Sequence, residues 1–127
     1  MPDKVKLVYT KVYAVDIGSH VFPTSKYNLI KERLLRDSPF KERLDFVTPK
    51  RASDEDILLV HDKGYLEKLK KGTLTEEEII RLELPYSKEL VRASLLCCGG
   101  TLLASRIALE DRMGIHLGGG FHHAFPD

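Results

Sequence analysis

Short strand-like segments alternate with helical segments along this chain, and that order limits the folds it can adopt. The first such segment, residues 5–13, combines alternating apolar positions with β-branched and aromatic residues. Residues 44–49 form a second strand pattern that Pro49 closes, and residues 113–117 form a third. The order strand, helix, strand, several helices, strand predicts an α/β fold, with an open and mostly parallel sheet and helices on its faces. We expect a single domain, residues 1–127, with a small sheet.

Helical periodicity and capping residues define the segments between the strands. Thr75 and Glu78 form a capping box before the apolar residues of one short helix. Acidic residues 54–56 follow Ser53 in a first turn, where the helix dipole favours negative charge. The remaining predicted helix boundaries are Thr24 or Ser25 at one N-terminus, Ser87 at the N-terminus of the longest helix, and Asp37–Pro39 and Gly72 at two C-terminal ends.

The longest predicted helix, residues 88–110, is apolar almost all round, which predicts burial on more than one side. Gly99 and Gly100 lie in its middle, and each costs about 1 kcal/mol relative to alanine. Close packing against another backbone, that of the sheet, would explain them; a cofactor site is the alternative. The two cysteines, Cys97 and Cys98, lie in the same apolar pattern and are interpreted as reduced, buried residues, with a reactive pair as the alternative.

Composition limits the partners and the compartment expected for the chain. The 127 residues include 20 basic and 19 acidic side chains, for a formal net charge of +1. Binding to nucleic acid is not predicted, because it requires a basic patch or stripe. No uninterrupted run of about 18 apolar residues indicates a membrane span. Residues 1–4 lack the apolar core of a signal peptide, so we expect a cytoplasmic protein.

The last predicted strand leads directly into Gly118–Gly120 and then into His122 and His123. Three glycines allow close approach to a bound group and backbone conformations with positive φ. Ligands of open α/β sheets bind outside the carboxyl ends of the strands, where these residues are expected to lie. The segment therefore predicts a functional site. The alternatives are an ordinary turn, a zinc site made by His116 with the two later histidines, and a phosphate loop, which lacks the Gly-Lys-Ser/Thr ending.

Residues 117–127 (LGGGFHHAFPD) resemble the tandem-histidine motif of the histone deacetylase family, in the arginase/deacetylase superfamily. Two further segments, residues 20–27 (HVFPTSKY) and 59–66 (LVHDKGYL), resemble an early loop and a His-Asp-x-x-Tyr-Leu segment of the same family. The resemblance is to the branch that includes class IV and bacterial deacetylase-like proteins. It implies the N-terminal portion of a three-layer α/β/α deacetylase-like domain, incomplete in this chain.

The resemblance assigns catalytic roles to His122 and His123. In the family, two such histidines flank a zinc-bound water that attacks the carbonyl of acetyl-lysine, releasing acetate and a free amine. By motif position, His123 would be the proton shuttle, and His122 would tune and stabilise charge. Gly120 and Phe121 would line the channel that holds the substrate's aliphatic stem; core packing is the alternative for Phe121.

Three other residues gain expected roles from the resemblance. Lys26 occupies a position near the inner end of the family's pocket where many members carry arginine; lysine keeps the charge but lacks the planar fork. His20 is the other substrate-binding candidate, with a solvated or backbone-bonded loop histidine as the alternative. His61 is expected to be structural rather than a metal ligand. The chain departs from the family at the substrate-gripping aspartate that some members carry before the long helix, because residues 82–86 offer only Glu83 there.

The family's zinc ligands, two aspartates and a histidine, lie C-terminal to the tandem-histidine motif. We therefore expect zinc in the full-length protein, no metal ligand and no bound zinc in this chain, and no activity of the chain by itself. The expected substrate is acetylated lysine or an acetylated small amine. The alternative function is a non-catalytic interaction module or pseudo-enzyme fragment, which would form a homo-oligomer through exposed apolar surface.

Overall fold

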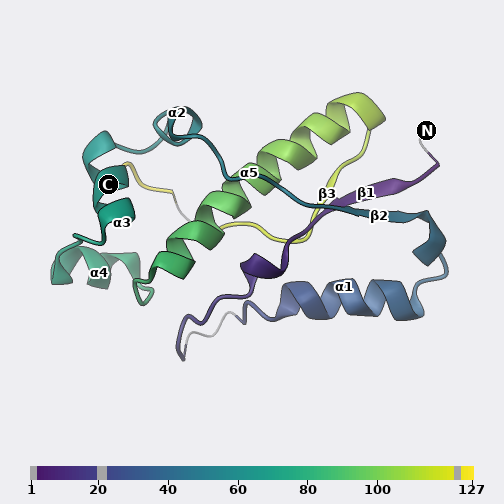
Figure 1. Cartoon of the computed structure of the whole chain (residues 1–127), viewed down its shortest axis with the longest axis horizontal. Coiled ribbons are helices and arrows are strands. Elements are labelled where there is room, and N and C mark those ends of the chain that lie inside the picture. The colour runs from purple at the N-terminus through teal and green to yellow at the C-terminus, as the bar shows by residue number, and fades with distance from the viewer. Residues whose placement is uncertain (1–2, 20–22, 122–123) are drawn as a thin grey trace.

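A computed structural model describes residues 3–19, 23–121 and 124–127. Its sheet has three parallel strands, β1 (Val5–Val8), β2 (Leu44–Val47) and β3 (Ile115–His116), in the order β2-β1-β3 (Figure 1). The central strand β1 pairs Val8 with Val47 on one side and with His116 on the other. This arrangement confirms the predicted α/β class and the parallel sheet.

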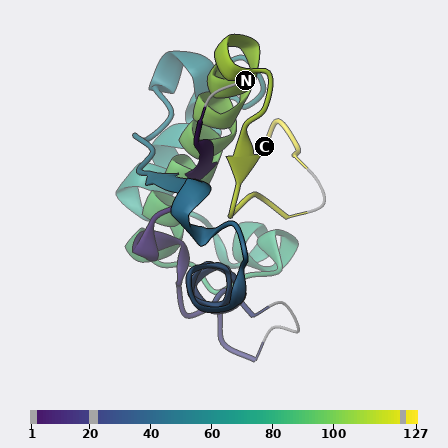
Figure 2. The ribbon, with the colours of Figure 1, turned by 90° about the vertical axis from the view of Figure 1, so that its right-hand side faces the viewer.

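Helices lie on both sides of the sheet, with α5 over one face and α1 on the other (Figures 1 and 2). Val8 packs against Ala104 and Ile107 of α5, whereas Tyr9 packs against Tyr27 of α1. Successive residues of a strand point to opposite faces, so this alternation builds the three layers. The helical elements are η1 (Lys11–Tyr13), α1 (Lys26–Asp37), η2 (Lys41–Arg43), α2 (Asp54–Ile57), α3 (Lys63–Lys71), α4 (Glu76–Leu82) and α5 (Lys88–Asp111).

Most of the predicted helix boundaries are confirmed. The Ser53, Thr75 and Ser87 side chains each accept a hydrogen bond from a first-turn backbone N–H, and both halves of the Thr75–Glu78 capping box form. Gly72 ends α3 in the left-handed conformation, with φ of 72°. Ser25 is the N-cap residue of α1, as predicted, but its side chain makes no capping hydrogen bond. The Thr24 hydroxyl instead donates to the Val15 carbonyl at 2.6 Å and accepts from its N–H at 3.1 Å.

The first strand is shorter than predicted. It ends at Val8, and residues 11–13 form the 3-10 helix η1. The Thr10 hydroxyl accepts a hydrogen bond from the Val12 N–H at 3.3 Å, which favours the turn. The turn carries the Tyr13 side chain into the core, where it is 2% exposed.

α5 is buried on one face, so the predicted burial on more than one side is wrong for this chain. Leu102 and Leu109 are 37% and 87% exposed. By length and composition α5 could also cross a membrane, but the core helix of an α/β domain has the same features. The buried positions of α5 are Leu90, Ala93, Leu96, Gly99, Gly100, Ala104 and Ile107.

The prediction that the α5 glycines pack against another backbone is confirmed for Gly99, although that backbone is the segment after β2 and not the sheet. A Cβ on Gly99 would overlap the Lys50 carbonyl oxygen and lie 2.9 Å from its carbonyl carbon. In the same place the Ala52 N–H donates to the Leu95 carbonyl at 3.0 Å. Gly99 therefore packs against the chain that leaves β2. Gly100 packs against two side chains of the candidate site.

Candidate functional site

The glycine run begins at the carboxyl end of β3, beside the carboxyl end of β1. The Leu117 N–H donates to the Val8 carbonyl at 2.9 Å, which extends the strand pairing by one residue past β3. After Val8, β1 leads into η1, so Tyr13 lies at the same end of the sheet. The run therefore lies at the sheet edge where open α/β folds bind ligands, as the sequence predicts.

A tyrosine–histidine pair, with Tyr13 buried and His116 half-buried, lies beneath the glycine run. The Tyr13 hydroxyl oxygen is 2.7 Å from His116 Nε2, and the Thr101 hydroxyl oxygen is 3.2 Å from Nδ1 of the same ring. The Tyr13 and His116 rings meet edge to face, with centroids 5.5 Å apart. Burial raises the pKa of Tyr13 and lowers the pKa of His116. Both side chains are therefore neutral at pH 7.

Gly118 and Gly100 enclose this pair and have no room for a side chain. A Cβ on Gly118 would lie 2.5 Å from Tyr13 Cε2 and 2.8 Å from His116 Nε2. A Cβ on Gly100 would overlap His116 Nε2 and the Tyr13 hydroxyl. Glycine at both positions thus lets the run and α5 approach the pair from two directions.

Cys97 of α5 also borders the run. Burial raises the pKa of the Cys97 thiol, while a hydrogen bond from the Gly119 backbone lowers it to a smaller extent. Desolvation likewise raises the pKa of Cys98, but Cys98 is exposed and Cys97 is half-buried, so the prediction that both cysteines are buried is wrong. Reactive thiols need a lowered pKa, so the structure favours the structural interpretation of the two cysteines.

α1 contributes an aromatic and cationic wall next to the pair. The Tyr13 and Tyr27 rings lie 5.9 Å apart edge to face, and Lys31 Nζ is 4.7 Å from the centroid of the Tyr9 ring. Lys26, a predicted substrate-binding residue, is the first residue of α1, with its Nζ 5.5 Å from the Tyr27 ring centroid. The structure thus places Lys26 at the end of α1 that approaches Tyr13.

Two more of the predicted site residues are described by the structure. Gly120 ends the run and Phe121 follows it; both are exposed, Phe121 by 42%. His20, His122 and His123 lie outside the described residues, so their assigned roles stay predictions.

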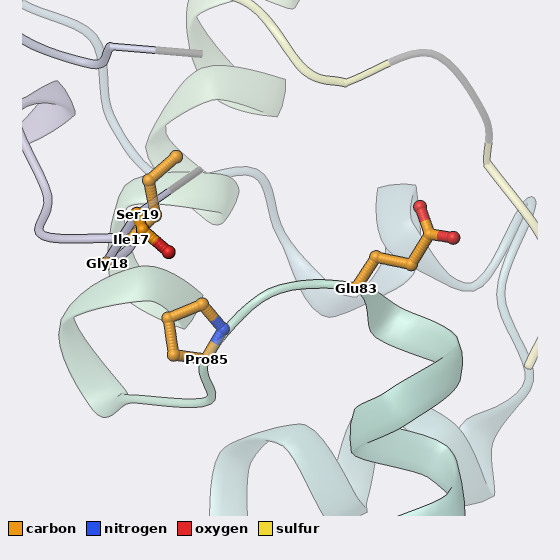
Figure 3. Close-up of a pocket in the computed structure, with 5 residues that line it drawn as sticks. All are labelled: Ile17, Gly18, Ser19, Glu83 and Pro85. Atoms are coloured by element: carbon orange, nitrogen blue, oxygen red, sulfur yellow. The ribbon is translucent and has the colours of Figure 1, made fainter. Parts of the chain in front are cut away.

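A hollow of about 350 Å³ lies between the loop after η1 and the connection from α4 to α5 (Figure 3). Ile17, Gly18 and Ser19 line one side, and Glu83 and Pro85 line the other. Glu83 ends α4 in the left-handed conformation, with φ of 59°. Glu83 is therefore part of a concave surface.

Residues 124–127, at the end of the chain, lie next to α3, near the end labelled C in Figure 1. The Asp62 N–H donates to the Pro126 carbonyl at 2.8 Å, and Arg81 lies 3.9 Å from the Asp127 carboxylate. The His61 ring packs 5.6 Å from the Tyr65 ring, and its buried Nδ1 has no hydrogen-bond partner among the described residues. The structural role expected for His61 stays a prediction.

Comparison with known proteins now identifies the chain's relatives. The family model described as the histone deacetylase domain matches residues 20–127. The chain belongs to the histone deacetylase family. It is 34% identical over 121 residues to an uncharacterized protein of Picosynechococcus, 32% identical over 133 residues to histone deacetylase 2 of Arabidopsis thaliana, and 30% identical over 117 residues to the acetoin utilization protein AcuC of Staphylococcus aureus. These alignments include 94%, 94% and 84% of this chain.

The chain spans only 40%, 33% and 30% of the lengths of these three relatives. Within the described residues, no group of three or more His, Cys, Asp or Glu side chains is placed to hold a metal ion. Both ring nitrogens of His116 already lie within hydrogen-bond distance of Tyr13 and Thr101, which argues against the alternative zinc site that includes His116.

The sequence interpretation of this deacetylase-family chain missed the pairing of Tyr13 with His116. A weak signal existed, because a histidine in a strand beside a glycine run and a second glycine pair in a core helix both suggest close packing. The sequence could not show that these segments pack against the same pair.

Proposed function

We propose that this chain supplies the tandem catalytic histidines of a zinc-dependent deacetylase, which hydrolyses the acetyl amide of acetyl-lysine or a related acetylated amine. The observation that carries the proposal is the placement of the glycine run, at the carboxyl edge of a parallel sheet, in a chain that matches the histone deacetylase domain. The run leads into His122 and His123.

The proposed contribution of this chain to the reaction is proton transfer. His123 takes a proton from the attacking water and later gives a proton to the leaving amine, while His122 stabilises the charge that develops. Imidazoles suit both tasks because they titrate near neutral pH. The described residues hold no ligand group that fits zinc, so the steps proposed for this chain are proton transfers and substrate contacts.

Substrate contacts are proposed for the residues around the histidine pair. Gly120 and Phe121 would line the channel for the aliphatic stem, and their exposure leaves them accessible. His20 and Lys26 would act near the inner end of the pocket. Glu83 would contact the substrate backbone from the hollow it shares with Ile17–Ser19.

One observation favours the alternative, an interaction module that oligomerises. β3 is an edge strand of the sheet. Apolar side chains are also exposed in α5 and just after it: Leu102 is 37% exposed, Leu109 87% and Met113 40%. Such a surface is typical of an interface.

The deciding experiment compares this chain with a chimera, in which the chain is continued by the C-terminal part of Arabidopsis histone deacetylase 2. Hydrolysis of an acetyl-lysine peptide is measured for both, with and without a chelator. We expect activity in the chimera only, lost on chelation and on His123→Ala. Circular dichroism melting shows that each protein is folded.

Two outcomes would contradict the proposal. Zinc-dependent activity of the 127-residue chain would show that it holds metal ligands. A folded chimera without activity, together with a dimeric chain in sedimentation, would favour the interaction module.

A further inference from the structure

We propose that the Tyr13–His116 pair is a positioning device for the catalytic segment: it fixes the glycine run at Gly118 and thereby sets the place of His122 and His123. The inference deepens the proposed function and rests on it for its catalytic meaning. Its structural part, that the hydrogen bond between Tyr13 and His116 holds the run, is testable in the chain by itself.

The pair connects three elements that are distant in the sequence. Tyr13 comes from η1, His116 ends β3, and Thr101 comes from α5. The 2.7 Å and 3.2 Å contacts place one imidazole between the other two side chains, using both ring nitrogens. A ring held at both nitrogens has a fixed orientation, as do histidines held by supporting residues in designed sites.

We assign the donors and acceptors of the pair as part of the proposal, because the heavy-atom distances leave the His116 tautomer open. At 2.7 Å the Tyr13 hydroxyl donates to His116 Nε2, since its other acceptor, the Leu96 carbonyl, is 3.5 Å away. Nδ1 then carries the hydrogen and donates to the Thr101 hydroxyl. A neutral imidazole with its hydrogen on Nδ1 completes both bonds, and burial, which lowers the pKa of His116, favours this neutral form.

The glycine run rests directly on this pair. Gly118 approaches the Tyr13 ring and the His116 ring so closely that no side chain fits. One residue earlier, the Leu117 N–H is bonded to the Val8 carbonyl. After Gly118 the backbone leaves the extended strand conformation and reaches the surface: Gly119 has φ of 138°, and Gly120 is exposed. The pair thus supports the run at Gly118, and Cys97 contacts it one residue later through a hydrogen bond with the Gly119 backbone.

Matched variants separate the hydrogen bond from simple packing. His116→Gln keeps an amide acceptor for the Tyr13 hydroxyl, whereas His116→Leu removes it. Tyr13→Phe removes the hydroxyl and keeps the ring. Tyr86→Phe is the control, because the Tyr86 hydroxyl donates to the Leu69 carbonyl at 2.6 Å, away from the run.

The first readout is nuclear magnetic resonance of the 127-residue chain. We expect the His116 ring nitrogens to show the Nδ1–H tautomer. The backbone amide signals of Gly118–Gly120 should shift in Tyr13→Phe and His116→Leu, and remain near their original positions in His116→Gln and Tyr86→Phe. The inference is overturned if Tyr13→Phe moves these signals no more than Tyr86→Phe does, or if His116→Gln moves them as far as His116→Leu.

The second readout is catalysis in the chimera described above. Misplacing a catalytic segment by about 1 Å can cost up to about 100-fold, so we expect Tyr13→Phe to lower kcat by about 10- to 100-fold with little change in KM. An unchanged kcat, in a variant whose glycine signals do move, would overturn the catalytic part of the inference. An inactive parent chimera would instead count against the proposed function, while the amide shifts would still decide the structural part.

Discussion

The edge region, which comprises β1, η1, α5, β3 and the glycine run, differs from the α2–α4 segment in what holds it together. In the edge region the Tyr13–His116 hydrogen bond joins residues 103 positions apart, and Gly99 packs on the chain after β2. In the α2–α4 segment, residues 54–82, caps bind their own first turns and exposed ion pairs join neighbouring helices. Close contacts between distant residues therefore concentrate around the glycine run.

The largest expected effect comes from placing the same substitution in each region. Gly99→Ala would force the new Cβ into the Lys50 carbonyl group, and such overpacking costs about 1–3 kcal/mol or more of unfolding free energy. Gly64→Ala in α3 meets no atom within 4 Å, and should raise the unfolding free energy by about 0.5–1 kcal/mol because alanine favours the helix.

Urea denaturation of the two glycine variants measures this difference. Equal effects of the two substitutions would contradict the prediction. They would mean that Gly99 of α5 is packed no more closely than Gly64 of α3.

A smaller loss is expected from Thr75→Ala at the start of α4. The Thr75 hydroxyl accepts from the Glu78 N–H at 3.2 Å, and the Glu78 carboxylate accepts from the Thr75 N–H at 2.7 Å. Losing such a cap costs about 1 kcal/mol. Thermal melting checks the value, with Thr75→Ser, which keeps the hydroxyl, as the control. A loss as large as that of Gly99→Ala would remove the contrast between the two regions.

These comparisons also explain which features the sequence could predict. Caps such as Thr75–Glu78 and the stop at Gly72 depend on residues within a few positions, so the sequence pattern predicts them. η1 was mistaken for strand because the pattern of Val12 and Tyr13 fits both, and tertiary packing of Tyr13 decided between them. The one-sided burial of α5 depends on what packs against it, which its own apolar pattern does not contain.

The sequence could likewise predict only part of the candidate site. Its place at the carboxyl edge of the sheet was predictable, because a strand pattern leads directly into Gly118–Gly120 and parallel topology fixes where such a strand ends. The contacts beneath the glycine run could not be predicted, because Tyr13, Thr101 and His116 meet only after folding. The resemblance to the family supplied roles for residues, but not the contacts that hold them.

The pH dependence of stability should differ between the regions. Burial lowers the pKa of folded His116 below its unfolded value near 6.5, so its contribution to stability is complete above about pH 6.5 and falls as pH decreases through the folded pKa. Unfolding of the wild-type chain and of His116→Gln, followed between pH 7.5 and 5, isolates this contribution. We expect a steeper acid loss in the wild type. Identical slopes would show that His116 is not desolvated.

The smallest expected effect is that of an exposed ion pair in the α2–α4 segment. Lys70 of α3 contacts the Asp54 carboxylate of α2, but their side chains are 41% and 58% exposed. Water and salt screen such charges, so the coupling should be about 0.5 kcal/mol or less. A double-mutant cycle with Asp54→Asn and Lys70→Gln measures it at low and high salt. A coupling above about 1 kcal/mol that persists in salt would exceed the usual range for exposed pairs. It would show that α2 and α3 are joined as firmly as the elements of the edge region.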